Sequence, residues 1–129
     1  MAVVVPLLMV DDVAATVEYY EAKLGFAREL VYPPAAPEFA TVRFEGARLM
    51  FEAGAGFAAK YGMEATVWPW GRGVDLNVAM DGAIDAYYGR VTAAGAEVAR
   101  PIFTTEYGMR QFTVRDLNGY LLTFIRHGE

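Results

Sequence analysis

Hydrophobic and polar residues along the chain switch from a strand pattern to a helix pattern twice. Residues 3–10 form an apolar, largely β-branched run that predicts a buried strand. Asp11 or Asp12 can accept hydrogen bonds from the free amides that open a helix. The apolar residues that recur at helical spacing after them are Val13, Val17, Tyr20 and Leu24. We predict that the helix buries these side chains and ends at Gly25 in a left-handed turn.

Three more strands are predicted in the first half of the chain. Residues 26–31 form the first of them, and the proline-rich segment 33–37 then forces a loop. Residues 39–44 and 48–52 follow as extended segments that are joined by a hairpin turn at Gly46. The order of elements in this half is therefore strand, helix and three strands, a βαβββ unit.

The second half of the chain repeats this order. Residues 74–79 predict a strand, Asp81 is predicted to cap the following helix, and Gly95 is predicted to end it. The inner face of this helix is predicted to consist of Ile84, Tyr88 and Val91. The strands after it are predicted at residues 96–99, 110–114 and 120–126. An Asn-Gly pair at 118–119 marks the turn between the last two strands.

The spacing between the two halves indicates a duplication. Gly25 and Gly95 lie 70 residues apart, whereas the helical pairs Tyr19-Tyr20 and Tyr87-Tyr88 lie 68 apart. The second helix is therefore predicted to be about two residues longer, and in each pair the second tyrosine is expected in the core and the first partly exposed. A repeat of this length exceeds a solenoid unit and fits a duplicated αβ module. Two such modules are expected to enclose a cleft, where function should lie.

We predict a single domain built from two modules, about residues 1–53 and 73–129. The stretch between them, about residues 54–72, is rich in glycine and contains Trp68 and Trp70 without a clean periodicity. It is therefore predicted to be a connector that crosses from one half to the other or into a partner subunit.

Composition narrows the class of protein. The net charge of −5 argues against binding nucleic acid through its phosphates. The chain has no cysteine, which fits a reducing compartment, and no apolar stretch long enough to span a bilayer. A cytoplasmic protein without membrane contact is expected. Aromatic residues make up 14% of the chain, which favours either a ligand pocket or an aromatic-rich core.

Two segments resemble a known superfamily. The first runs from a strand into Asp12, a helix with a tyrosine pair, and then residues 24–26. The second is the closing stretch 112–121, with Leu117 where the family's hairpin often has proline. With the duplicated βαβββ unit, they resemble the vicinal oxygen chelate superfamily of glyoxalase I, extradiol dioxygenases and bleomycin-resistance binding proteins. The resemblance implies an α+β fold in which both modules form a curved mixed sheet around a cleft, paired in a homodimer that can exchange strands.

The resemblance also implies where a divalent metal would bind. Enzymes of this family hold the metal with His, Gln or Glu side chains on the first, fourth, fifth and eighth strands. The matching positions here are Val5, Gly73, Thr123 and either Met50 or Glu52. At most one carboxylate remains, and one carboxylate cannot hold a transition metal against water. His127, near the C-terminus, is interpreted as a solvated tail residue, so neither a metal nor another cofactor is expected.

Strand alternation predicts a cleft wall that is largely apolar with a few polar groups. The predicted ligand-binding residues are Met9, Phe39, Met50, Glu52, Trp68, Trp70, Asp75, Asn77, Phe103, Tyr107 and Thr123. An aspartate within an apolar strand needs a partner or water, so Asp75 either lies at an open cleft mouth or pairs with an arginine such as Arg110. The two tryptophans either stack on a planar ligand or seal a subunit interface.

The residue types present favour binding over catalysis. The chain has no cysteine or serine, and no histidine is placed to activate a threonine. We therefore expect a metal-free protein that sequesters a planar aromatic antibiotic or related metabolite, with a cationic ligand as one option. The alternatives are an isomerase, lyase or dioxygenase with a degenerate metal site, and a regulatory scaffold whose cleft is collapsed.

Overall fold

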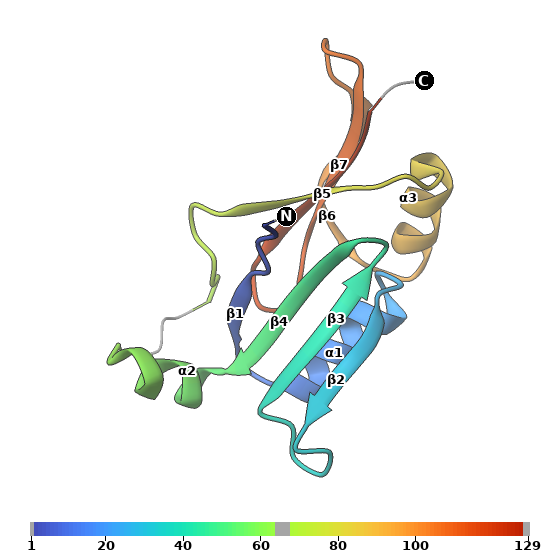
Figure 1. The fold of residues 1–129 in the computed structure, drawn as a ribbon. Helices are drawn as coiled ribbons and strands as arrows, with labels where there is room; N and C mark the ends of the chain where they lie inside the picture. Colours follow the sequence, from blue (N-terminus) through green and yellow to red (C-terminus); the bar gives the residue numbers. More distant parts are fainter. Residues whose placement is uncertain (1, 64–67, 128–129) are drawn as a thin grey trace. The chain divides into compact units, whose positions relative to one another are not determined.

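The computed structural model describes residues 2–63 and 68–127 of the chain. The chain divides into two compact units, residues 1–68 and 69–129, which we call the first and second module. The division falls inside the predicted connector. Each module has a four-stranded mixed sheet with one ten-residue helix packed on it (Figure 1). The predicted α+β architecture of two similar βαβββ modules is confirmed.

The first module begins with a strand and a helix that follow the sequence pattern closely. Its elements are β1 (Leu7–Val10), α1 (Val13–Ala22), β2 (Ala27–Tyr32), β3 (Phe39–Phe44), β4 (Ala47–Ala53) and α2 (Gly54–Tyr61). The strand order is β1-β4-β3-β2, with β1 parallel to β4 and the other pairs antiparallel. Asp12 caps α1 by accepting the N–H of Ala15 at 2.9 Å, and Gly25 after the helix has a φ of 72°.

The core of the first module lies between α1 and the sheet. The four side chains predicted for the buried stripe of this helix, Val13, Val17, Tyr20 and Leu24, are all buried. The Tyr20 ring lies 5.0 Å from that of Phe51 on β4 and 5.1 Å from that of Phe26. These contacts attach the helix to the sheet through aromatic rings in favourable tilted and edge-on geometries.

The first strand is shorter than predicted. The apolar run 3–10 is paired with β4 over Leu7–Val10, and Val3 and Val4 are exposed. The pairing of β1 with β4 begins after Pro6. The oxygen of Pro6 accepts the N–H of Met50 at 2.9 Å, but proline has no N–H to donate to the sheet, so the regular ladder does not continue before it.

The second module repeats the arrangement, and its first three strands are longer than those of the first module. Its elements are β5 (Asp75–Ala79), α3 (Ile84–Ala93), β6 (Glu97–Thr104), β7 (Met109–Arg115) and β8 (Leu121–His127). The strand order is β5-β8-β7-β6, with β5 parallel to β8. Phe112 and Phe124 are fully buried, and Tyr87 packs against both rings from α3.

The predictions for α3 were wrong in three respects. The helix begins at Ile84 after Ala83, which supplies no side-chain hydrogen bond, so Asp81 is not its N-cap. Both α1 and α3 have ten residues, so the second helix is not longer. Tyr87 is buried, with 3% exposure, and Tyr88 is half-buried, the reverse of the prediction. The buried residues of α3 are Ile84, Tyr87 and Val91, with i, i+3, i+7 spacing in place of the predicted i, i+4, i+7. The tyrosine pair is therefore buried through its first member in α3 and through its second member in α1.

The predicted connector is partly helical. Residues 54–61 form α2, which has no buried side chain and ends at Gly62 in a left-handed conformation. The helix was not predicted, because the glycines of this stretch favour a loop in the sequence. The connector's residues 64–67 lie outside the described residues.

The end of the connector is attached to the second module. The N–H of Trp70 donates to the oxygen of Asn118 at 3.0 Å. Gly119 has a φ of 93°, and a Cβ at that position would lie 2.5 Å from Pro69. Asp116 closes the same turn, because its Oδ1 accepts the N–H groups of Asn118 and Tyr120. Only glycine fits at position 119, since both the backbone conformation and the approach of Pro69 exclude a side chain.

Candidate functional site

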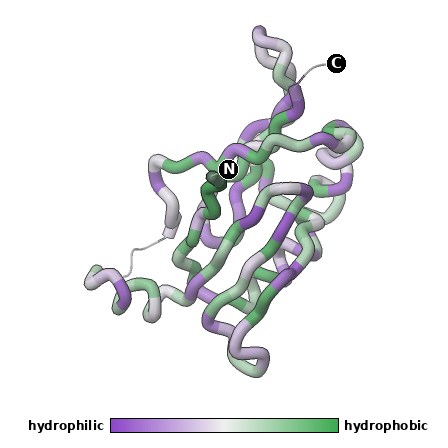
Figure 2. Tube along the Cα trace, viewed as in Figure 1, coloured by the Kyte–Doolittle hydropathy of each residue, from purple (hydrophilic) through white to green (hydrophobic). Residues whose placement is uncertain are grey.

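The face of the first sheet that points away from α1 brings several predicted site residues together. Leu49 and Phe51 are buried in the core, so the alternate residues of β4, Met50 and Glu52, point the other way. Figure 2 shows that hydrophobic and hydrophilic residues both occur along the strands of this sheet. Glu52 is paired with Met9 on β1 and with Phe39 on β3, so these three residues form one row. We call the surface formed by Leu7, Met9, Leu30, Tyr32, Phe39, Thr41, Met50 and Glu52 the first-module face.

The one carboxylate of the first-module face is engaged by α2. Lys60 Nζ lies 2.7 Å from Glu52 Oε1, which is shielded from solvent. The Glu52 side chain is 18% exposed, and its carboxylate, paired with the ammonium group, raises the pKa of Lys60 above the ordinary value of 10.5. At the start of α2, Gly54 approaches Met9, since a Cβ there would lie 3.7 Å from Met9 Cγ. The helix thus supplies the cation for Glu52 and covers Met9.

The corresponding face of the second sheet is polar. Thr123 Oγ1 donates to Asp75, at 2.7 Å from Oδ1 and 2.9 Å from Oδ2, and lies 2.7 Å from Thr113 Oγ1. A hydroxyl has one proton, so Thr113 must donate to Thr123 while Thr123 donates to the carboxylate. Both threonines are buried and Asp75 is exposed. Arg110, the alternative partner predicted for Asp75, binds Asp85 instead.

Residues of β5 and β6 extend the polar face of the second sheet around Asp75 and Thr123. Asn77 is paired with Thr123 and donates from Nδ2 to the backbone oxygen of Asp75 at 3.0 Å. Phe103 on β6 is paired with Gln111, and the Arg100 guanidinium lies 4.6 Å from the Phe103 ring. We call the surface formed by Asp75, Asn77, Arg100, Phe103, Gln111, Thr113, Thr123 and Ile125 the second-module face. Thr113, Arg100 and Gln111 were not predicted, although strand alternation around the buried Phe112 would have indicated Gln111 and Thr113.

Three predicted site residues lie away from these faces. Tyr107 is 81% exposed at the tip of the hairpin between β6 and β7 (Figure 1). Trp68 is 59% exposed in an irregular stretch at the end of the first module. Trp70 is half-buried beside the turn that contains Asn118. A role for these aromatic residues in binding stays a prediction.

The registers of the two sheets identify which positions are equivalent. Phe51 is paired with Leu8 and with a β3 residue, and Phe124 is paired in the same way with Val78 and with a β7 residue. Counting one residue back along β4 and β8 makes Met50, and not Glu52, the counterpart of Thr123. Counting three residues back from Leu8 and Val78 gives Val5 and Asp75. Asp75, and not Gly73, is therefore the counterpart of Val5 in the second module.

The four equivalent positions do not fit a divalent metal. They hold Val5, Met50, Asp75 and Thr123, a set with one carboxylate whose two oxygens both accept from a hydroxyl. Within residues 2–63 and 68–127, no three His, Cys, Asp or Glu side chains gather where they could hold a metal ion. The donor chemistry is therefore that of a hydrogen-bonding site rather than a metal centre.

Comparisons with known proteins agree with this architecture. TioX from Micromonospora sp. ML1 is 28% identical, with a TM-score of 0.76 over 98% of this chain and 99% of that chain. A glyoxalase/bleomycin resistance protein/dioxygenase from Nocardioides is 22% identical, with a TM-score of 0.76 over 100% of this chain and 85% of that chain. A glyoxalase-related enzyme from Fulvimarina pelagi is 20% identical, with a TM-score of 0.77 over 98% and 88%. The last two show the fold alone.

No curated protein matches the chain significantly. In the part of the chain that the structure describes, no helix is long and apolar enough to cross a membrane. The model of the glyoxalase/bleomycin resistance protein/dioxygenase superfamily matches residues 2–124. The chain belongs to the glyoxalase/bleomycin resistance protein/dioxygenase superfamily.

Proposed function

We propose that the protein binds and sequesters a small aromatic molecule, an antibiotic or a related metabolite, without a metal. The superfamily contains both metal enzymes and binding proteins, so the residues at the metal positions distinguish the two classes. The observation that carries the proposal is that Val5, Met50 and Thr123 stand at three of these positions. The fourth, Asp75, accepts hydrogen bonds from Thr123 instead of joining a ligand set.

The first-module face supports an aromatic ligand. Leu30 and Tyr32 are largely exposed there, and Phe39 and Met50 lie in the same two rows. Exposed apolar side chains that are neighbours on a sheet are a typical binding surface, and aromatic rings offer flat contact area to a planar molecule. This surface gives binding energy through burial of apolar area rather than through chemistry.

The second-module face by itself supports recognition of a hydrogen-bond donor group on a small molecule. The Asp75 carboxylate is exposed and its orientation is fixed by Thr123, which is in turn fixed by Thr113. A carboxylate offers about four acceptor sites, so the hydroxyl of Thr123 leaves acceptor capacity for a ligand N–H or ammonium group. Fixing the carboxylate in advance reduces the entropy lost on binding.

Titration calorimetry with a defined panel tests the proposal. The panel contains bleomycin, the planar cation ethidium and a planar neutral aromatic of similar size. We expect at least one to bind, with Asp75→Asn weakening the cationic ligands about tenfold, which equals about 1.4 kcal/mol. Asp85→Asn is the matched control, because Asp85 lies on α3 and outside both faces. Absence of binding by the whole panel, or equal loss in both variants, contradicts the proposal.

The alternative is a glyoxalase- or dioxygenase-like enzyme with a degenerate metal site. The observation that favours it is that Asp75 does occupy one of the family's metal positions. Elemental analysis of the purified protein separates the two functions. Stoichiometric Fe, Mn, Ni or Zn that is lost in Asp75→Ala but kept in Asp85→Ala would establish the enzyme and overturn the binding proposal.

A further inference from the structure

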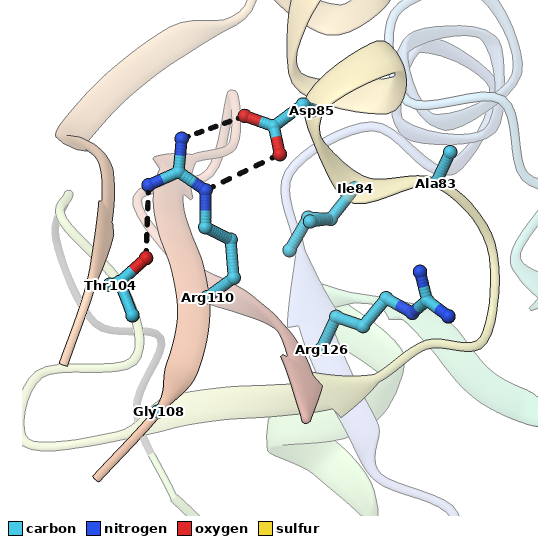
Figure 3. A pocket seen from close by; sticks show the side chains of 7 residues that line it. All are labelled: Ala83, Ile84, Asp85, Thr104, Gly108, Arg110 and Arg126. Carbon is cyan, nitrogen blue, oxygen red and sulfur yellow. Dashed lines mark hydrogen bonds and ion pairs between the residues drawn. The ribbon is translucent and has the colours of Figure 1, made fainter. Parts of the chain in front are cut away.

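A pocket of about 330 Å³ lies on the α3 side of the second sheet. It is lined by Ala83, Ile84, Asp85, Thr104, Gly108, Arg110 and Arg126 (Figure 3). Arg110 lies two residues before Phe112, and Arg126 lies two residues after Phe124, so each arginine is on the same face of the sheet as a ring that packs against Tyr87 of α3. The two arginines therefore lie on the opposite side of the sheet from Thr113 and Thr123. The pocket is separate from the second-module face.

One wall of the pocket is a fixed guanidinium. Arg110 donates from Nη2 to Asp85 Oδ1 at 2.7 Å, from Nε to Asp85 Oδ2 at 3.3 Å, and from Nη1 to Thr104 Oγ1 at 3.2 Å. A charged hydrogen bond raises the pKa of Arg110 and lowers the pKa of Asp85. These bonds use three of the five N–H donors of the guanidinium. The donors that remain have a fixed direction, because the fork is held from two sides.

The rest of the pocket adds positive charge and an apolar floor. Figure 3 shows Arg126 on the other side of Ile84 from Arg110, and Ile84 is buried. Two arginines and one aspartate line the pocket, on a chain whose net charge is −5. The start of α3 also borders the pocket and adds the positive end of the helix dipole. The two guanidinium groups and the start of the helix therefore supply N–H donors of the kind that bind oxyanions.

We propose that this pocket binds a small organic anion, a carboxylate or phosphate group attached to a compact apolar body. Arginine forks match the geometry of both oxyanions. Ile84 between the two guanidinium groups is suited to the apolar body. The volume is at the lower end for small-molecule sites, which limits the ligand to the size of one substituted ring. This site is independent of the proposed sequestration of an aromatic molecule.

Chemical-shift titration of the full chain tests the inference with benzoate, phenyl phosphate and inorganic phosphate as probes. We expect benzoate or phenyl phosphate to shift the amides of residues 83–85 and 108–110, and Arg126→Gln to weaken that binding at least about tenfold. The two organic probes distinguish a carboxylate site from a phosphate site. Inorganic phosphate is expected to bind more weakly, because it has no apolar body to place on Ile84.

Arg28→Gln is the matched control, because Arg28 forms a bidentate ion pair with Glu21 in the first module. It is expected to leave the titration unchanged. Ala83→Phe is a second variant that narrows the pocket without removing a charge, and it is also expected to abolish binding. No shift with any probe at millimolar concentration, or unchanged binding in a folded Arg126→Gln or Ala83→Phe, overturns the inference. Asp75→Asn is expected to leave anion binding intact, which separates this result from the sequestration proposal.

Discussion

In the first module, β4 directs Met50 away from the helix, and in the second module β8 directs Thr123 to the equivalent side. Their neighbours differ in the same way, with Leu7 beside Met50 and Asn77 beside Thr123. The residues directed toward the helices are instead alike, since Phe51 and Phe124 are both fully buried. The comparison teaches that a duplicated module keeps the pattern of its core, because packing constrains it, while the opposite face is available for different chemistry.

The largest expected effect tests the equivalence of the cores. Phe51→Ala and Phe124→Ala each remove a fully buried ring that contacts a helix tyrosine. Each is expected to lower the free energy of unfolding by about 3–5 kcal/mol through lost burial and the remaining cavity. Urea denaturation followed by circular dichroism measures both. A difference of more than about 2 kcal/mol between the two variants would show that the modules do not share one core design.

The second-largest loss of stability is expected in the turn between the last two strands of the second module, and not in the corresponding turn of the first. Gly119→Ala is expected to destabilise the protein by about 2 kcal/mol, because the residue has a φ of 93° and lies against Pro69. Gly46, in the corresponding turn, has no atom within 4 Å of an added Cβ. Gly46→Ala is therefore expected to change stability by less than about 0.5 kcal/mol. Equal thermal shifts for the two variants would refute the difference between the turns.

A smaller loss of stability is expected from breaking the hydrogen bonds of Thr113 and Thr123 in the second module. Thr123→Val is expected to cost about 1–2 kcal/mol, because Thr113 loses its acceptor in a buried position. Replacing both threonines by valine is expected to restore much of that loss, since no buried hydroxyl is then left without a partner. A double-mutant cycle in urea measures the coupling. Additive losses would show that the two hydroxyls do not act together.

The smallest effect is a pH dependence that the modules have in common. Arginine hydrogen bonds lower the pKa of Glu21 and of Asp85 below their ordinary values of 4.5 and 3.8. A lowered pKa in the folded state stabilises the fold above those values, and the contribution disappears as the pH falls through the folded pKa. Both pairs are solvent-exposed, so each contribution is small. Thermal melts of Glu21→Gln and Asp85→Asn from pH 6 to 2 should show a shallower acid decline than the parent, and an unchanged slope would contradict this.

The sequence predicted the fold best where one side of an element is buried. The stripe of α1 from Val13 to Leu24 and the strand 39–44 were correct, because burial imposes a period on the residues. The helix α2 was missed because its glycines favour a loop, and Tyr87 was misplaced because i+3 and i+4 spacing both fit a helix. The errors thus have physical causes, since backbone propensity and side-chain spacing each allow more than one local structure.

The candidate site was less predictable than the fold. Alternation placed Asp75, Asn77 and Thr123 on one surface, which the register confirms. Alternation around Phe112 would also have placed Thr113 on this surface, but its contact with Thr123 could not be predicted, because it depends on which residues of β7 and β8 are opposite each other. Gly73 was assigned to the fifth-strand position from its distance to an apolar run. Strand pairing assigns Asp75 to that position instead, and pairing cannot be read from one sequence.

The contacts of Pro69 and Trp70 with the turn at Gly119 determine where a fragment that contains only the second module should start. A fragment that starts at residue 73 would lack the chain that covers this turn, and the oxygen of Asn118 would lose its donor. A fragment that starts at residue 69 keeps both. The fusion or split point for expressing the second half alone is therefore set before Pro69, where the chain divides into its two compact units, and not at the first residue of its first strand.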